Sequence, residues 1–135
     1  MSAHAAVADS WAVLAAIRGE GKAAPTMRRL LQRARAGNLR LLLNLVNLGE
    51  AYCRLIEIMG QSAADEHLAR LRAAPFEMIP VQEPLVLEAG RVKAAHPVSY
   101  ADAFAVATAR LEHAPVVSGD PRLSRFRAAW SGFVV

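Results

Sequence analysis

The hydrophobic positions along the chain change their period several times between the two ends of the sequence. Short, nearly continuous apolar runs are typical of strands that are buried on both faces. Between them, apolar residues recur every three or four positions, which is typical of helices with one buried face. Strands that alternate with helices predict an α/β fold, with a mainly parallel sheet covered by helices on both faces. No repeat, low-complexity tract or linker interrupts the pattern, so we expect a single domain over residues 1–135.

The pattern places each element between recognisable helix and turn signals. The expected strands are residues 5–8, 39–43, 76–81, 116–117 and 133–135. The expected helices are residues 10–18, 25–36, 44–60, 62–74 and 83–96, a helix from Ser99 that ends before Pro115, and one helical turn around Leu123 and Phe126. On the first helix we expect Trp11, Val13, Leu14 and Ile17 to share the apolar face, and we expect Ser62 to begin the fourth helix. Pro80 indicates that the third strand is short or lies at an edge of the sheet.

The composition limits the classes of protein that this chain can belong to. Its 54% of hydrophobic residues excludes a disordered chain, and no apolar run approaches the ~20 residues of a membrane span. A single cysteine, Cys53, allows no internal disulfide, so we expect a reducing, cytoplasmic location and an inert, buried thiol. The amino end lacks the features of a signal peptide.

The charge is positive and carried almost entirely by arginine. The chain has a net charge of +4, and Lys22 and Lys93 are its only lysines. Seven basic residues against Glu20 alone give an excess of +6 between Arg18 and Arg40; they are Arg18, Lys22, Arg28, Arg29, Arg33, Arg35 and Arg40. This stretch is either a solvated helix face or a surface that faces phosphate, which arginine binds in a planar, bidentate way.

Two aspartates lie in the stretch from Ser99 to Pro121. Ser99 and Asp102 form the spacing of a capping box at the start of a helix. Asp120 follows the short strand 116–117, in a turn that begins at Ser118. Each has an ordinary structural explanation, because Asp102 could only complete the capping box and Asp120 could only shape the turn.

Two more carboxylates occupy equivalent places earlier in the chain. Asp9 stands where the first strand meets the first helix, and it or Ser10 could cap that helix. Glu50 lies early in the helix after the second strand, where an i,i+4 pair with Arg54 is the simple alternative. Gly49 argues against that alternative, because glycine inside a helix costs about 1 kcal/mol relative to alanine. A close approach to the backbone at this point would explain it.

The carboxyl ends of parallel strands meet at one edge of a sheet, so we expect these four carboxylates to converge. Clustered carboxylates repel one another, and a bound cation relieves that repulsion. Oxygen ligands without nearby histidine or cysteine favour Mg²⁺ or Mn²⁺. The four histidines of the chain have no metal-ligand spacing.

Four segments in this order resemble the motifs of PIN-domain ribonucleases, and more narrowly those of the small VapC-type toxins of VapBC toxin–antitoxin pairs. They are Val7-Ala-Asp9-Ser-Trp-Ala-Val-Leu-Ala, Asn47-Leu-Gly-Glu50-Ala-Tyr, Ser99-Tyr-Ala-Asp102-Ala-Phe-Ala-Val-Ala and Ser118-Gly-Asp120-Pro. The resemblance covers almost the whole chain. It implies a three-layer α/β/α fold and an endoribonuclease that depends on Mg²⁺ or Mn²⁺.

The resemblance also implies roles for individual residues. Asp9, Glu50, Asp102 and Asp120 would form the acidic metal site, and Ser10 and Ser118 match positions that often carry a hydroxyl nearby. The metal would activate water and stabilise charge on the attacked phosphate. Family members are usually dimers that are silenced by an antitoxin, whose carboxyl-terminal segment fills the acidic groove.

One departure concerns the position after the last motif. Many relatives carry a further acidic residue there, whereas this chain has Pro121-Arg122-Leu123. The departure leaves the number of metal ions open and makes Arg122 a candidate for contacting RNA phosphate.

Two other functions fit parts of the sequence. A receiver-like signalling domain has this size and clustered aspartates around Mg²⁺, but it needs a late lysine, and the chain has none after Lys93. A PIN-like module that binds RNA or protein without cleaving it would keep the fold and lose the chemistry.

Overall fold

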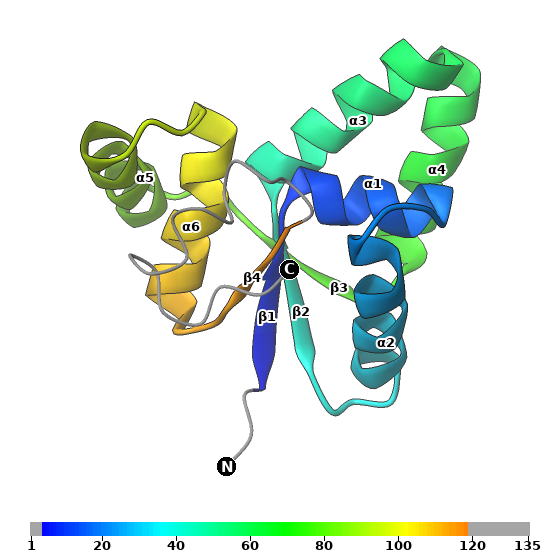
Figure 1. Cartoon of the computed structure of the whole chain (residues 1–135), viewed down its shortest axis with the longest axis horizontal. Coiled ribbons are helices and arrows are strands. Elements are labelled where there is room, and N and C mark those ends of the chain that lie inside the picture. The colour runs from blue at the N-terminus through cyan, green and yellow to red at the C-terminus, as the bar shows by residue number, and fades with distance from the viewer. Residues whose placement is uncertain (1–3, 119–135) are drawn as a thin grey trace.

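The computed structural model describes residues 4–118, which form four strands and six helices (Figure 1). In chain order they are β1 (Ala5–Ala8), α1 (Ser10–Arg18), α2 (Ala23–Arg35), β2 (Arg40–Asn44), α3 (Leu45–Met59), α4 (Gln61–Ala73), β3 (Phe76–Ile79), α5 (Glu83–Ala95), α6 (Tyr100–Glu112) and β4 (Val116–Val117). Every strand and long helix expected within this range is present, with bounds shifted by at most a few residues. The expected helical turn around Leu123 and the expected strand 133–135 lie outside the described residues.

The four strands form one parallel sheet in the order β3-β2-β1-β4. The first strand of the chain lies inside this sheet, where Val7 pairs with Leu42 on one side and Val116 on the other. β3 lies at an edge of the described sheet, which is the position that Pro80 predicts. Because all the strands run the same way, their carboxyl ends meet at one edge, at the top of Figure 1.

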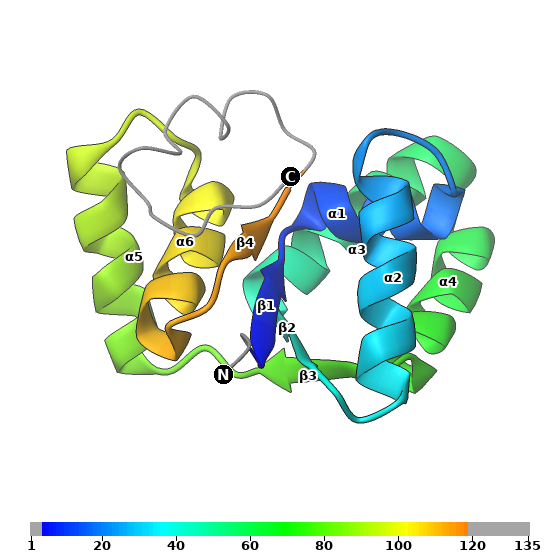
Figure 2. The same cartoon turned by 60° about the horizontal axis from the view of Figure 1, so that its bottom comes forward.

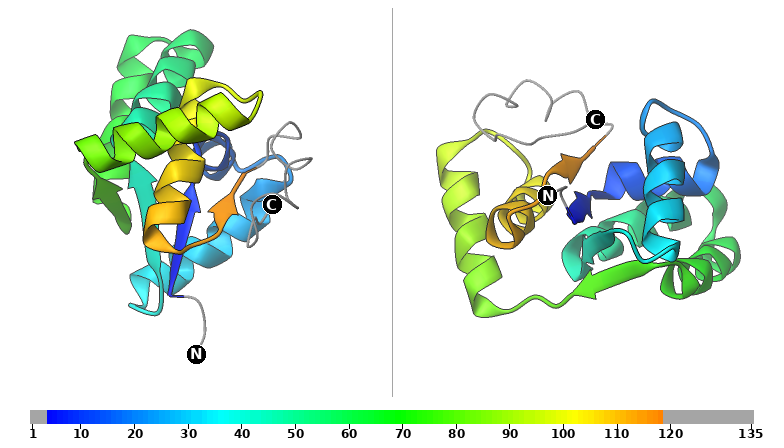
Figure 3. Two further views of the ribbon diagram at one scale, coloured as in Figure 1. Left: turned by 90° about the vertical axis from the view of Figure 1, so that its left-hand side faces the viewer. Right: turned by 90° about the horizontal axis from the view of Figure 1, so that it is seen from below.

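Alternate residues of the strands face opposite layers of helices, as the period of a strand requires. Val7 and Leu42 pack in a core with residues of α5 and α6, whereas Leu41 and Leu43 pack in a second core with residues of α1, α2 and α3. Figures 2 and 3 show α5 and α6 on one side of the sheet and α1, α2 and α4 on the other. The three-layer α/β/α architecture with a parallel sheet is therefore confirmed.

Side-chain caps fix the starts of several helices. The side chain of Asn44 accepts a hydrogen bond from the Asn47 N–H at 2.8 Å, and the Ser99 hydroxyl accepts one from the Asp102 N–H at 3.1 Å. The expected start of the fourth helix at Ser62 is wrong, because α4 begins at Gln61 with Gly60 as its N-cap residue. A glycine with a positive φ of 86° makes this sharp junction between α3 and α4 without a capping side chain.

Two side chains are more exposed than the sequence pattern predicts. Cys53 is exposed rather than buried, and the helix that carries it, α3, projects beyond the sheet beside α4 (Figure 1). Trp11 is also exposed, since Ala12 and Val13 occupy the buried side of α1. No helix within residues 4–118 has the length and apolar content needed to cross a membrane.

Candidate active site

Asp9 is the point at which β1 passes into α1. Its side chain is buried, and Oδ1 accepts a hydrogen bond from the Ala12 N–H at 2.8 Å, so Asp9 rather than Ser10 caps α1. The capping explanation is therefore correct for this residue. It does not exclude a second role, because a capping carboxylate has further lone pairs, and the helix amino terminus lowers the free energy of the negative charge.

A hydrogen bond joins the side chain of Ser10, in α1, to that of Glu50, in α3. The hydroxyl of the buried Ser10 donates a hydrogen bond to Oε1 of Glu50, which lies in the second turn of α3. Arg54, the alternative partner that the i,i+4 spacing suggests for Glu50, pairs with Glu57 at 3.3 Å instead. The carboxylate of Glu50 is thus directed toward the junction of β1 and α1.

Asp102 is the third residue of α6 and is buried. Because α6 leads into β4 and packs against the parallel sheet, its amino terminus lies at the carboxyl edge, as Figure 1 shows. β1 and β2 also end at this edge. Asp9 directly follows β1, and α3 begins directly after β2. Three elements therefore bring Asp9, Glu50 and Asp102 to one end of the sheet.

A buried chain of amides joins α3 to α6 at this edge. The Asn44 Nδ2 donates hydrogen bonds to Asn47 Oδ1 at 2.7 Å and to Thr108 Oγ1 at 3.1 Å. The Asn47 Nδ2 donates to the carbonyl of Ala101 at 3.0 Å, next to Asp102. Sequence reasoning missed this network, although its signal is visible: Asn44 and Asn47 stand three apart inside an otherwise apolar run.

Of the three remaining predicted site residues, one lies within residues 4–118 and two lie outside them. Ser118 follows β4 and is fully buried, at the same edge of the sheet. Asp120 and Arg122 lie outside the described residues. Within residues 4–118, no three acidic, histidine or cysteine side chains are grouped so that they could hold a metal ion. The donor atoms at this edge are carboxylate, hydroxyl and amide oxygens, which is the donor type that hard divalent cations prefer.

Gly49 faces open space in the described part of the chain. Nothing within residues 4–118 lies within 4 Å of the place that a Cβ would take, so these residues do not make the close approach to the backbone that would explain the glycine. The open side of α3 at Gly49 directly precedes Glu50.

The arginine-rich stretch is not one uniform surface. Arg18 pairs with Glu20 at 2.8 Å, and Arg40 pairs with Glu77 at 2.5 Å and with Glu112 at 3.4 Å. The other five basic residues are Lys22, Arg28, Arg29, Arg33 and Arg35, on α2 or directly before it. α2 descends along the strands to the start of β2, so its last turn lies near the edge opposite the carboxylates (Figure 2).

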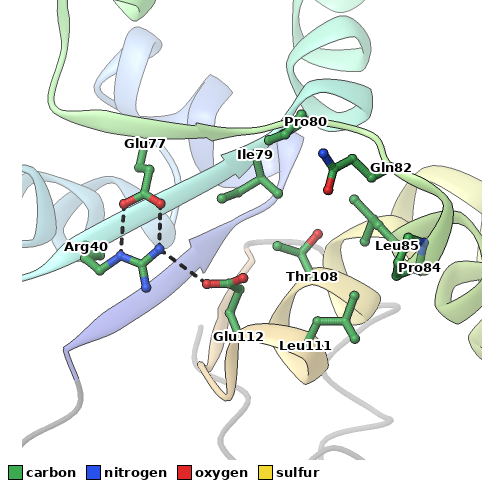
Figure 4. A pocket seen from close by; sticks show the side chains of 10 residues that line it. All are labelled: Arg40, Glu77, Ile79, Pro80, Gln82, Pro84, Leu85, Thr108, Leu111 and Glu112. Carbon is green, nitrogen blue, oxygen red and sulfur yellow. Dashed lines mark hydrogen bonds and ion pairs between the residues drawn. The ribbon is translucent and has the colours of Figure 1, made fainter.

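A pocket of about 230 Å³ lies away from the carboxylates, among β3, α5 and the last turns of α6 (Figure 4). Arg40 lines it and binds Glu77 and Glu112, and Ile79, Leu85 and Leu111 contribute apolar walls. The hydrogen bonds and charge of Arg40 hold the pKa of Glu77 below its usual value. None of the predicted site residues within residues 4–118 lines this pocket.

Comparison with known proteins gives one family and a set of related folds. The family model of the PIN domain matches residues 6–129. No significant match was found among curated protein sequences.

Several solved structures share the fold over almost their full length. VapC20 from Mycobacterium tuberculosis, described as a sarcin-ricin loop cleaving toxin, has a TM-score of 0.72 and 22% identity over 96% of each chain. VapBC2 from Rickettsia felis, bound to a DNA fragment from its promoter, has a TM-score of 0.73 and 12% identity over 96% of each chain. A toxin–antitoxin complex from Klebsiella pneumoniae has a TM-score of 0.67 and 15% identity over 96% of each chain. At these identities the likeness establishes the fold.

Proposed function

Because the chain belongs to the PIN-domain family, we propose that it is a metal-dependent endoribonuclease and the toxin of a type II toxin–antitoxin pair. The observation that carries the proposal is the placement of Asp9, Glu50 and Asp102 on three elements that end or begin at one sheet edge. The family match also removes the receiver-like signalling domain from consideration.

The proposed metal site comprises Asp9, Glu50, Asp102 and Asp120. A bound Mg²⁺ or Mn²⁺ would activate water and stabilise charge on the attacked phosphate. Asp9 is positioned by its cap on α1, and Ser10 orients Glu50 through their hydrogen bond. Asn47 holds the start of α6, and with it Asp102, against α3. Ser118 is a supporting hydroxyl at the end of β4, and Arg122 is a candidate for contacting RNA phosphate.

We further propose that the chain forms a homodimer and is silenced by a cognate antitoxin in the cytoplasm. The similar structures described as VapBC or toxin–antitoxin complexes support an antitoxin partner for this chain. If the chain is a toxin, its expression alone should arrest growth and Asp120→Asn should restore growth. Equal arrest by both forms would favour a module that binds without cleaving.

The test of the enzyme uses Asp102→Asn, with Asp65→Asn as its matched control. Asp65 is an exposed aspartate on α4 that accepts hydrogen bonds from Tyr52 and Gln61, and it is not one of the predicted site residues. We expect the wild type and Asp65→Asn to cleave RNA in Mg²⁺ or Mn²⁺ and to stop when EDTA is added. Asp102→Asn should remain folded, lose cleavage, and lose the rise in melting temperature that Mn²⁺ gives the wild type.

Two results would contradict the proposal. Cleavage that survives exhaustive EDTA treatment would exclude the metal mechanism. An Asp102→Asn protein that unfolds more easily but cleaves normally per folded molecule would mean that Asp102 serves only the helix start.

A further inference from the structure

The pocket among β3, α5 and the last turns of α6 has an apolar wall, formed by Ile79, Leu85 and Leu111 (Figure 4). Its volume of about 230 Å³ is that of about eight water molecules, at about 30 Å³ each. Leu111 is 45% exposed, so part of this wall is apolar surface in contact with solvent. A short aliphatic chain fits the volume, and its contact with the wall would remove apolar surface from water.

Three side chains of the same pocket have hydrogen-bond acceptors to spare. The buried hydroxyl of Thr108 donates its proton to a carbonyl of α6 at 2.7 Å and accepts a hydrogen bond from Asn44 at 3.1 Å, so one lone pair remains. The side chain of Gln82 makes no capping hydrogen bond to α5, at whose start it lies. Glu112 contacts Arg40 through Oε1 at 3.4 Å, which leaves Oε2 for another donor. Figure 4 shows these acceptor side chains around one pocket.

The charges that line the pocket favour a cation. Two carboxylates, Glu77 and Glu112, against the single guanidinium of Arg40 leave an excess of one negative charge. Arg40 donates hydrogen bonds to both oxygens of Glu77, at 2.9 and 2.5 Å, so an anion would have to compete with this pair. A cation can bind Glu112 and leave the pair intact. Glu112 is also the last residue of α6, where the helix dipole favours positive charge.

The amino end of α5 also lies at the pocket, and a helix amino end by itself favours an anion. Its first turn already carries the negative charge of Glu83, and Pro84 has no N–H. The N–H groups of Leu85 and Val86 donate to the Gln82 carbonyl at 3.0 and 3.1 Å. The chain itself therefore satisfies most of this helix end, and the acceptor side chains decide the sign of the ligand.

We propose that this pocket binds a short aliphatic cation, an ammonium or guanidinium group on a chain of about four carbons. An ammonium group has three N–H donors for the three acceptor side chains, and its carbon chain contacts the apolar wall. The cation is either a free small molecule or the side chain of a lysine or arginine. The inference is independent of the proposed ribonuclease function, because the predicted site residues within residues 4–118 lie outside this pocket.

The experiment titrates the full-length, ¹⁵N-labelled protein with butylammonium at constant ionic strength and follows the chemical shifts of the backbone amides. Methylammonium tests the carbon chain, and pentanoate tests the sign of the charge. Nα-acetyl-lysine N-methylamide presents the same cation as a side chain. Glu112→Gln is the test variant. Glu57→Gln is its matched control, because Glu57 pairs with Arg54 at 3.3 Å on α3 and does not line the pocket.

We expect butylammonium to shift the amides of Leu85, Leu111 and Glu112 until they saturate. Methylammonium should bind more weakly, by about 4-fold for each methylene group that the pocket buries. Pentanoate should not shift these amides. Glu112→Gln should weaken binding of butylammonium by about 5-fold, the effect of a partly exposed ion pair, and Glu57→Gln should leave it unchanged.

The two sources of the cation predict different orders of affinity. If the natural ligand is a free amine, butylammonium should bind more tightly than the blocked lysine, whose peptide groups do not fit beside the chain. If it is a side chain, the blocked lysine should bind at least as tightly. Either order supports a site for an aliphatic cation.

Three results would overturn the inference. Equal binding of methylammonium and butylammonium would mean that the apolar wall holds no chain. Pentanoate that shifts the same amides as strongly would contradict the preference for a cation. Equal affinities of Glu112→Gln and Glu57→Gln for butylammonium would mean that Glu112 does not bind the ligand. Cleavage of RNA tests the ribonuclease proposal separately, and each proposal can fail without the other.

Discussion

Asn47 is the buried side chain on which the alignment of two site helices depends. Its amide accepts a hydrogen bond from Asn44 and donates one to the carbonyl of Ala101. We expect Asn47→Ala to lower the free energy of unfolding by about 2–3 kcal/mol, since it removes two hydrogen bonds and leaves one N–H of the buried Asn44 amide without an acceptor. Chemical denaturation measures this change.

Thr108→Val is the matched comparison within the same network. This substitution removes the Thr108 hydroxyl, which accepts a hydrogen bond from Asn44 and donates one to the Phe104 carbonyl. The hydrogen bond between Asn44 and Asn47 remains. We therefore expect a smaller loss of about 1 kcal/mol. An equal or larger loss for Thr108→Val would contradict a leading role for Asn47.

At the residue scale, candidate site residues were easier to select from the sequence than the exposure and partners of each side chain were to predict. The carboxylates and the serines beside them could be selected as candidates because helix starts and strand ends are local signals. The exposure of Trp11 and Cys53 was predicted wrongly, since it depends on which side of α1 meets the sheet and how far α3 projects beyond it. The amide network was missed because Asn44 and Thr108 are distant in sequence.

Within the helices, Gly49 and Gly90 form a matched pair for testing an open surface. Both lie inside helices, and at neither would a Cβ come within 4 Å of another group in the described part of the chain. We expect alanine at either position to raise the free energy of unfolding by about 0.4–1 kcal/mol. If the backbone beside Glu50 meets the substrate, Gly49→Ala should also lower kcat/KM, whereas Gly90→Ala should not. Unchanged kcat/KM in both variants would exclude a close substrate approach at Gly49.

Arg40 joins three elements, because it lies at the start of β2 and binds Glu77 of β3 and Glu112 of α6. The pairs are half exposed, so we expect Arg40→Met to lower the free energy of unfolding by less than about 1 kcal/mol at pH 7. The pKa of Glu77 is lowered by Arg40, so this stabilisation is complete above the ordinary glutamate pKa of about 4.3 and is lost as the pH falls through the lower folded value.

Urea titrations of the wild type and Arg40→Met across this range check the sign. The difference between the two proteins should shrink as the pH falls below about 4.3. A difference that does not change with pH would mean that Arg40 stabilises the fold through packing of its stem instead.

Elements were predictable where a local signal marks both ends. Gly19 ends α1 in a left-handed conformation, and Ser99 caps α6, as the sequence indicates. The start of α4 was predicted wrongly because a serine followed by an aspartate three residues later has the same local pattern as a cap. In the fold, Asp65 instead accepts a hydrogen bond from Tyr52 of α3, which no local pattern contains.

Within residues 4–118, the basic side chains of α2 and the carboxylates of the proposed site lie at different places along the sheet. α2 has 13 residues and is about 20 Å long, so its last arginines are far from the site edge. Changing Arg28, Arg29 and Arg33 to glutamine should therefore weaken binding of a long RNA and reduce its salt slope by about 2, at about 0.7 per contact. A short oligonucleotide that fills only the site should bind unchanged.

The control is a triple glutamine variant of Arg54, Arg70 and Arg72, which makes the same change in net charge on α3 and α4. It should leave the salt slope unchanged for both RNAs. Equal slopes in the two triple variants would mean that RNA senses only the net charge. The surface of α2 would then be available for contacts with a second subunit or an antitoxin.

The placement of Asp9, Glu50 and Asp102 at one edge of the sheet was predictable, because parallel topology brings the ends of distant strands together. The same topology has a consequence for synthesis on the ribosome. β1 is the first strand to emerge, yet one of its two neighbours in the sheet is β4, made after nearly all the described residues. Because non-local pairing must wait for its partner, the sheet stays open along one side until β4 emerges. If the chain is the ribonuclease proposed above, we expect a nascent or truncated chain that contains Asp9 and Glu50 but lacks α6 to be inactive, because it lacks Asp102, so that synthesis itself would delay the appearance of activity.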